Sequence, residues 1–146
     1  MWHQVPYSAG SPYPAGNGLP AGHIAYRPFL VTHLEVGQTR VSCLSLLDSG
    51  ADHCVFPLSF ALLLGFNPVG APQVMTGGIG SAAVPMYYWT ITVDFGPAQF
   101  DVLAGFTEDM NGKGFGLLGQ HGFFEHFSVQ FDLPNRVFWI EVPDGF

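Results

Sequence analysis

The sequence has few charged residues and very few basic ones. Asp, Glu, Lys and Arg make up 10% of the 146 residues, and eleven acidic residues against four basic ones give a net charge of −7. The fixed cations are Arg27, Arg40, Lys113 and Arg136. Four cations cannot neutralise many phosphates, so the sequence argues against nucleic acid as a partner. The negative net charge also disfavours binding to an anionic membrane surface.

Cysteines and long apolar runs are also scarce. Cys43 and Cys54 are too few for a disulfide framework or a four-cysteine metal site, and we expect two buried thiols. The longest apolar run, near residues 60–66, is far shorter than the roughly 18 residues of a membrane span. The N-terminus lacks the basic start and apolar run of a signal peptide, which favours a cytoplasmic location.

Apolar residues, glycine and proline are abundant. Hydrophobic residues account for 48% of the chain and aromatic residues for 15%, enough for one sizeable core. Four of the 19 glycines and four of the 12 prolines fall in residues 1–22, and no charged residue precedes Arg27. This composition predicts an arm over residues 1–23 without regular structure, followed by a domain over residues 24–146.

Short β-type runs dominate the rest of the chain. The predicted strands cover residues 29–36, 40–47, 54–57, 84–95, 99–105, 128–132 and 136–142. Helical turns are predicted over 59–64 and, as one short helix, over 119–127. Many short strands with little helix predict an all-β barrel or sandwich.

A carboxylate follows directly on an apolar strand in Leu46-Leu47-Asp48-Ser49-Gly50-Ala51-Asp52. The chain turns at Ser49-Gly50, where backbone N–H groups and the Ser49 hydroxyl can orient the Asp48 carboxylate. The same residues also occur in ordinary surface turns with a solvated aspartate. The motif alone therefore leaves both interpretations open.

Two glycine-containing motifs follow. Met75-Thr76-Gly77-Gly78-Ile79-Gly80-Ser81 predicts either a loose turn or a lid that approaches an extended ligand closely. Phe115-Gly116-Leu117-Leu118-Gly119 predicts an apolar strand ending at a glycine, against which other backbone can pack.

In this order and spacing, the Asp48 motif, the glycine lid and the apolar strand ending at Gly119 resemble the retropepsin family of aspartic proteases. The resemblance runs from about Arg27 to Phe127. It implies a retropepsin-like acid-protease lobe: a closed, barrel-like all-β fold with a glycine-rich flap hairpin and one or two short helices. It also implies a homodimeric aspartic endopeptidase that acts on peptide or protein substrates, with one Asp48 from each copy at the two-fold axis.

The resemblance carries roles to individual residues. The catalytic loop comprises Asp48, Ser49 and Gly50, with Ser49 bracing the two catalytic loops. The implied substrate-binding residues are Ala51, Asp52, His53, Val55, Gly77, Gly78, Ile79, Phe115 and Leu117. Arg27 is a candidate cross-subunit partner of Asp52.

The sequence also departs from the family pattern. Many members have Arg after the glycine that matches Gly119, whereas this chain has Gln120-His121, so the loop must be held differently. Most retroviral members have Thr where this chain has Ser49. His53 replaces a residue that is acidic in some members, which makes it a candidate pH-dependent specificity residue or an exposed polar one. The C-terminal hairpin extends beyond the retroviral core and, with the arm, is a candidate to replace or block the retroviral dimer interface.

Other interpretations stay open at this stage. A retropepsin lobe can serve as a non-catalytic dimerisation or peptide-binding module. A metal site built from His53, His121 and His126 is disfavoured because the five-residue spacing departs from i, i+4, and we expect neither metal nor cofactor. The arm is a candidate pro-segment, removed by self-cleavage between about Pro20 and Pro28.

Overall fold

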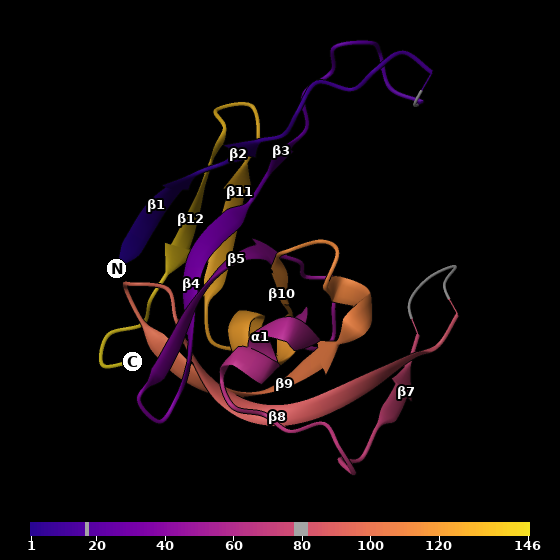
Figure 1. Ribbon diagram of the computed structural model, residues 1–146. Coiled ribbons are helices and arrows are strands. Elements are labelled where there is room, and N and C mark those ends of the chain that lie inside the picture. Colours follow the sequence, from indigo (N-terminus) through magenta and orange to yellow (C-terminus); the bar gives the residue numbers. More distant parts are fainter. Residues whose placement is uncertain (17, 78–81) are drawn as a thin grey trace.

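The computed structural model describes residues 1–16, 18–77 and 82–146, and its fold is dominated by β-strands (Figure 1). One large sheet forms the body of the molecule. Its strands are β4 (Phe29–Val36), β5 (Thr39–Leu47), β6 (Val55–Pro57), β7 (Val74–Thr76), β8 (Val84–Asp94), β9 (Gln99–Thr107) and β10 (Gly116–Leu118). Apart from β7, which was not predicted as a strand, these strands agree with the runs predicted from the sequence to within a few residues.

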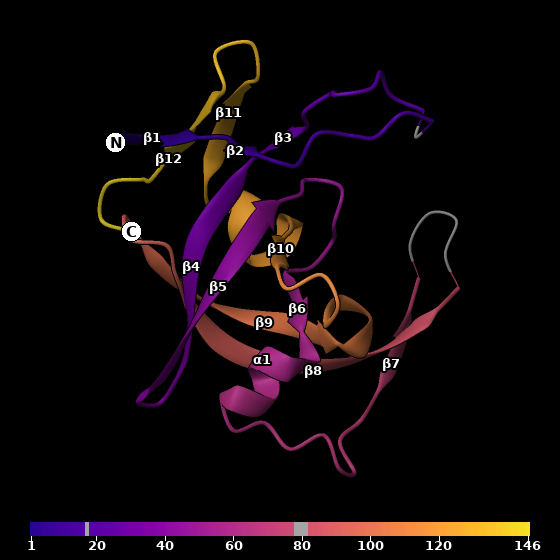
Figure 2. The ribbon, with the colours of Figure 1, turned by 45° about the horizontal axis from the view of Figure 1, so that its top comes forward.

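The large sheet closes on itself. Its strand order is β4-β5-β10-β6-β9-β8-β7, and β4 also pairs with β8 over His33–Glu35 and Thr92–Asp94. Figure 2 shows β8 and β9 curving beneath β4 and β5. This closure confirms the barrel-like all-β fold predicted from the sequence.

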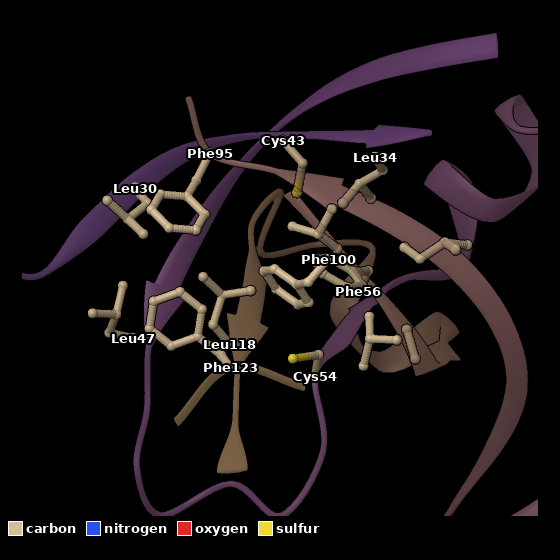
Figure 3. Close-up of a cluster of buried hydrophobic side chains, with 14 of the residues drawn as sticks. Leu30, Leu34, Cys43, Leu47, Cys54, Phe56, Phe95, Phe100, Leu118 and Phe123 are labelled. Atoms are coloured by element: carbon tan, nitrogen blue, oxygen red, sulfur yellow. The ribbon is translucent and has the colours of Figure 1, made fainter. Parts of the chain in front are cut away.

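Apolar side chains from all parts of the sheet fill the barrel (Figure 3). Leu34, Phe56 and Phe123 have no exposed surface. The Phe56 ring lies directly over Gly116, where a Cβ atom would come within 2.3 Å of the ring. Glycine at this position therefore lets β10 lie close to the core, next to β5.

The N-terminal strand corrects one prediction. We expected residues 1–22 to contain no regular element, but β1 (Trp2–Pro6) pairs with β12 (Val137–Glu141), which pairs in turn with β11 (Ser128–Asp132). Val5 and Tyr7 also pack against the core, and the Tyr7 and Phe138 rings are 5.5 Å apart. Long-range pairing with an available edge strand here outweighs unfavourable local composition.

Between this terminal sheet and β4 the chain projects as a long hairpin (Figures 1 and 2). Its base is formed by β2 (Ser8–Ala9) and β3 (Tyr26–Arg27), and further out Tyr13 and His23 are joined by a backbone hydrogen bond of 2.9 Å. The division of the chain at residue 23 and the removal of the arm stay predictions.

Helical structure is short. Helix α1 covers Leu58–Leu63, one residue from its predicted start, and a 3₁₀ turn, η1, covers Glu108–Met110. The single helix predicted over 119–127 is wrong: only η2 (Gln120–Phe124) is helix-like, and it is kinked at His121 and Gly122. Gly122 has φ = +94°, a conformation that an uninterrupted α-helix excludes. No helix in the described part of the chain has the length and apolar character that crossing a membrane requires.

A buried hydroxyl pair ties β4 to β5 beneath the Asp48 motif. Thr32 Oγ1 donates to the Cys43 carbonyl at 2.6 Å and lies 2.8 Å from Ser45 Oγ, and neither hydroxyl residue has exposed surface. Thr32→Val should therefore lower the free energy of unfolding by about 1–3 kcal/mol, since it leaves buried polar groups unpaired. Chemical denaturation checks this. The matched change in exposed Thr90 on β8 should stay within about 0.5 kcal/mol, and an equal effect of both changes would contradict the explanation.

Candidate active site

Asp48 lies where β5 ends. Strand β10 runs parallel to β5, and the Asp48 N–H donates to the Leu118 carbonyl at 3.0 Å. The chain then turns, and the Ala51 N–H donates to the Asp48 carbonyl at 3.1 Å. Within this turn the half-buried Asp48 carboxylate accepts the Gly50 N–H at 3.0 Å. Backbone geometry thus fixes the carboxylate of a residue that is only partly exposed to water.

A second loop, residues 119–125, packs against this turn. The Gln120 N–H donates to the Ala51 carbonyl at 2.8 Å, and the His121 N–H donates to the Asp52 carbonyl at 3.0 Å. A Cβ atom on Gly119 would lie 2.2 Å from the His53 carbonyl oxygen and 2.6 Å from that of Ala51. The absence of a side chain at Gly119 therefore allows the two loops to lie in direct backbone contact.

The Cys54 thiol lies behind both loops. Its sulfur accepts the Gly119 N–H at 3.4 Å, and its S–H donates to the His121 carbonyl at 3.4 Å. Burial is the main cause that raises the pKa of this thiol to about 11. The thiol therefore stays protonated and unreactive at neutral pH. Both cysteines are buried and free, as predicted.

The predicted apolar pocket residues lie on neighbouring strands. Val55 of β6 pairs directly with Leu117 of β10, and both are half-buried. Phe115, just before β10, packs edge-on against Phe29, with 5.2 Å between ring centroids. These residues lie on β6, which follows the Asp48 turn, and on or just before β10, which pairs with both β5 and β6.

His53 is held among aromatic rings. Its ring centroid is 5.2 Å from that of Tyr88 on β8 and 6.4 Å from that of His121. Its Nδ1 atom is buried and has no hydrogen-bond partner among the described residues. His53 is thus a partly buried residue, and the contact with Tyr88 is one that the sequence did not indicate.

The predicted flap is described in part. Strands β7 and β8 pair as a hairpin, with Thr76 opposite Val84. Figure 2 shows β7 extending from the barrel on the same side as the segment that connects β5 to β6. Gly77 follows β7 directly. The predicted flap residues Gly78 and Ile79 lie outside the described residues.

An open cavity of about 490 Å³ adjoins the Asp48 turn. Its lining residues are Ser49, Asp52, Gln120, His121, Phe124 and Glu125. Within the described chain, Arg27 donates to the Tyr13 hydroxyl at 3.3 Å and forms no ion pair with Asp52. The cavity thus presents carboxylates without a fixed cation from the described residues of the same chain.

The histidines near this cavity do not form a metal site. Glu125 Oε1 lies 3.1 Å from His121 Nδ1 and 3.6 Å from His126 Nε2. Across residues 1–16, 18–77 and 82–146, no three His, Cys, Asp or Glu side chains are arranged to hold a metal ion.

Comparison with known proteins relates the chain to a solved structure. No protein-family model and no curated protein sequence matches the chain. The structure is similar to the crystal structure of a retropepsin-like aspartic protease from Rickettsia conorii, with a TM-score of 0.59 and 18% sequence identity over 77% of this chain and 88% of the other. The closed barrel, the placement of the Asp48 turn and this similarity together identify the architecture: the chain has the retropepsin-like fold.

Proposed function

We propose that the chain is an aspartic endopeptidase that hydrolyses peptide bonds in extended substrates and acts as a homodimer. The observation that carries the proposal is the Asp48 carboxylate itself. It follows a buried strand of a retropepsin-like barrel, accepts the Gly50 N–H, and lies in a turn held by a second loop. Aspartates in ordinary surface turns also accept the N–H two residues on, so the contacts with the second loop are what set this turn apart.

A second copy is required because the chain supplies one such carboxylate. Asp48 is the only aspartate followed by Ser-Gly or Thr-Gly in the sequence. A two-fold axis beside the Asp48 turn would bring the two Asp48 carboxylates together. Ser49, exposed next to Asp48, is then placed to hydrogen-bond across the axis.

The chemistry follows from two close carboxylates. Both cannot ionise easily, so the pair holds one proton. The ionised Asp48 takes a proton from a water molecule as the water oxygen attacks the scissile carbonyl carbon, and the protonated Asp48 donates to the carbonyl oxygen. The resulting gem-diol collapses as the C–N bond breaks. The Asp48 that took the water proton donates it to the leaving amine nitrogen, and the other Asp48 takes a hydroxyl proton from the gem-diol. No covalent enzyme intermediate forms.

The remaining candidate residues have substrate-binding roles in this proposal. Gly50, Ala51 and Asp52 contact the backbone of the extended peptide. The flap closes over the substrate through Gly77, Gly78 and Ile79. Side chains of the substrate enter pockets formed by His53, Val55, Phe115 and Leu117. Arg27 of one copy is a candidate partner for Asp52 of the other, since no fixed cation among the described residues of the same chain pairs with it.

Cleavage of a mixed peptide library between acidic and neutral pH tests the proposal. We expect cleavage near apolar or aromatic residues and a specific activity that falls on dilution, because dimers dissociate at low concentration. Analytical ultracentrifugation over the same concentrations measures the dimer. A folded protein that cleaves nothing at any pH would instead support the non-catalytic binding module. Undiminished activity of a protein that sediments as a monomer would refute the shared site.

A further inference from the structure

Gln120 contacts the Asp48 turn twice. Its backbone N–H donates to the Ala51 carbonyl at 2.8 Å, and its side-chain Nε2 donates to the Ser49 carbonyl at 2.9 Å. The two acceptors alternate along the turn, on either side of Gly50. One residue of the second loop therefore fixes two peptide groups of the turn that carries Asp48.

The backbone around Gln120 is itself held by hydrogen bonds and packing. Gly119 lies in backbone contact with the turn, and the Glu125 N–H donates to the Gln120 carbonyl at 3.1 Å. Glu125 Oε1 accepts the Gly122 N–H at 2.6 Å, and Phe123 is completely buried in the core. The Gln120 side chain therefore extends from a fixed backbone to the rim of the cavity, where it reaches Ser49.

The two Gln120 bonds differ in what they depend on. The backbone bond to Ala51 can form with any residue except proline at position 120, whereas the bond to Ser49 requires a side-chain donor of this length. The described chain places no Arg or Lys at this carbonyl. Holding the Ser49 carbonyl fixes the Ser49–Gly50 peptide, and Gly50 is the residue whose N–H orients the Asp48 carboxylate.

We propose that Gln120 is a positioning residue for the Asp48 turn. Its side-chain amide donates to the Ser49 carbonyl and thereby sets the orientation of Asp48 and Ser49. The inference rests on the proposed function for its catalytic consequence. Its structural part, a donated hydrogen bond that orders the turn, stands independently of any activity.

Two variants with side chains close in size to Gln separate the effect of the donated hydrogen bond from the effect of side-chain packing at position 120. Gln120→Met cannot donate and should lower kcat about tenfold at every pH, with little change in KM, since one hydrogen bond that orients the catalytic group is lost. Gln120→Glu donates only while its carboxyl group is protonated, below a pKa of about 4.3 for an unperturbed Glu. The ratio of its kcat to the wild-type kcat should therefore approach one at about pH 3.5. Near neutral pH this ratio should fall to the value measured for Gln120→Met.

The activity comparison uses a ratio because nearby groups also titrate. Asp48, Asp52, His121 and Glu125 face this region in the wild type and in both variants. Gln120→Met adds no charge, so its kcat relative to wild type separates the loss of the donor from the pH dependence of these groups. Gln99→Glu, at the exposed start of β9, is the matched control, and its ratio should stay constant with pH. Equal pH profiles for Gln120→Glu and Gln120→Met would overturn the proposal.

NMR of the turn gives a readout that does not depend on activity. The carbonyl carbon signal of Ser49 should shift upfield in Gln120→Met, because a carbonyl that loses its donor is less deshielded. In Gln120→Glu the signal should return toward its wild-type position at low pH. An unshifted Ser49 carbonyl in Gln120→Met would overturn the inference, even in an active enzyme. A shifted carbonyl in a protein that cleaves no peptide would refute the proposed function and leave the structural inference intact.

Discussion

Asp48→Asn should abolish peptide cleavage while leaving the protein folded. An amide cannot accept the proton of the attacking water, and general acid–base groups contribute about 10²–10⁴-fold to rate. We therefore expect kcat to fall by at least about 10²-fold. Asn has the shape of Asp, and its side-chain oxygen can still accept the Gly50 N–H that Asp48 accepts at 3.0 Å. The turn should consequently keep its conformation.

Cleavage of a peptide identified from the library measures this effect. Asp144→Asn, an exposed position near the C-terminus, is the matched control and should retain wild-type activity. Circular dichroism and thermal unfolding establish that both variants fold. Cleavage by Asp48→Asn at the wild-type rate would show that another group performs the reaction.

Gly119→Ala should cause the largest loss of stability of any single methyl addition in the site. The added Cβ would lie 2.2 Å from the His53 carbonyl oxygen and 2.6 Å from that of Ala51, both of them backbone atoms. Relief requires the two loops to separate, which breaks the hydrogen bonds from Gln120 to Ala51 and from His121 to Asp52. Strain and lost hydrogen bonds together should cost about 3–5 kcal/mol of unfolding free energy.

Urea denaturation measures this loss of stability. Gly112→Ala is the matched control, because no atom lies within 4 Å of its Cβ position and its φ is not positive. We expect the control to change the unfolding free energy by less than about 1 kcal/mol. If Gly119→Ala were as stable as the control, the direct backbone contact between the two loops would be refuted.

Strands were predictable where the local pattern of apolar residues and turn glycines matches the strand pairing found in the structure. The hairpin of β4 and β5 has apolar residues on its buried face and a glycine at its turn, so its ends were predicted almost correctly. The position of Asp48 after an apolar strand was equally visible. Strand β1 was not predicted because its pairing with β12 joins residues more than 130 positions apart and leaves no local signal.

The contacts that hold the Asp48 turn were predictable only in part. The sequence indicated that Gly119 allows close packing and that no arginine follows it. It did not show that the Gln120 amide reaches the Ser49 carbonyl, because the two residues lie in separate loops 71 positions apart. Gly122 was the available signal that the helix predicted over 119–127 is interrupted. Likewise, the contact of His53 with Tyr88 depends on the path of β8 around the barrel.

Subunit mixing tests the central claim, a site shared by two copies of Asp48, most directly. Wild-type protein is incubated with about a ninefold excess of Asp48→Asn until subunits exchange, and activity per wild-type chain is measured. Random pairing leaves about one tenth of wild-type chains with a wild-type partner, so activity should fall to about one tenth. The same excess of an unrelated protein should have no effect. Full activity at complete subunit exchange would contradict the account, because it would show that one Asp48 is sufficient.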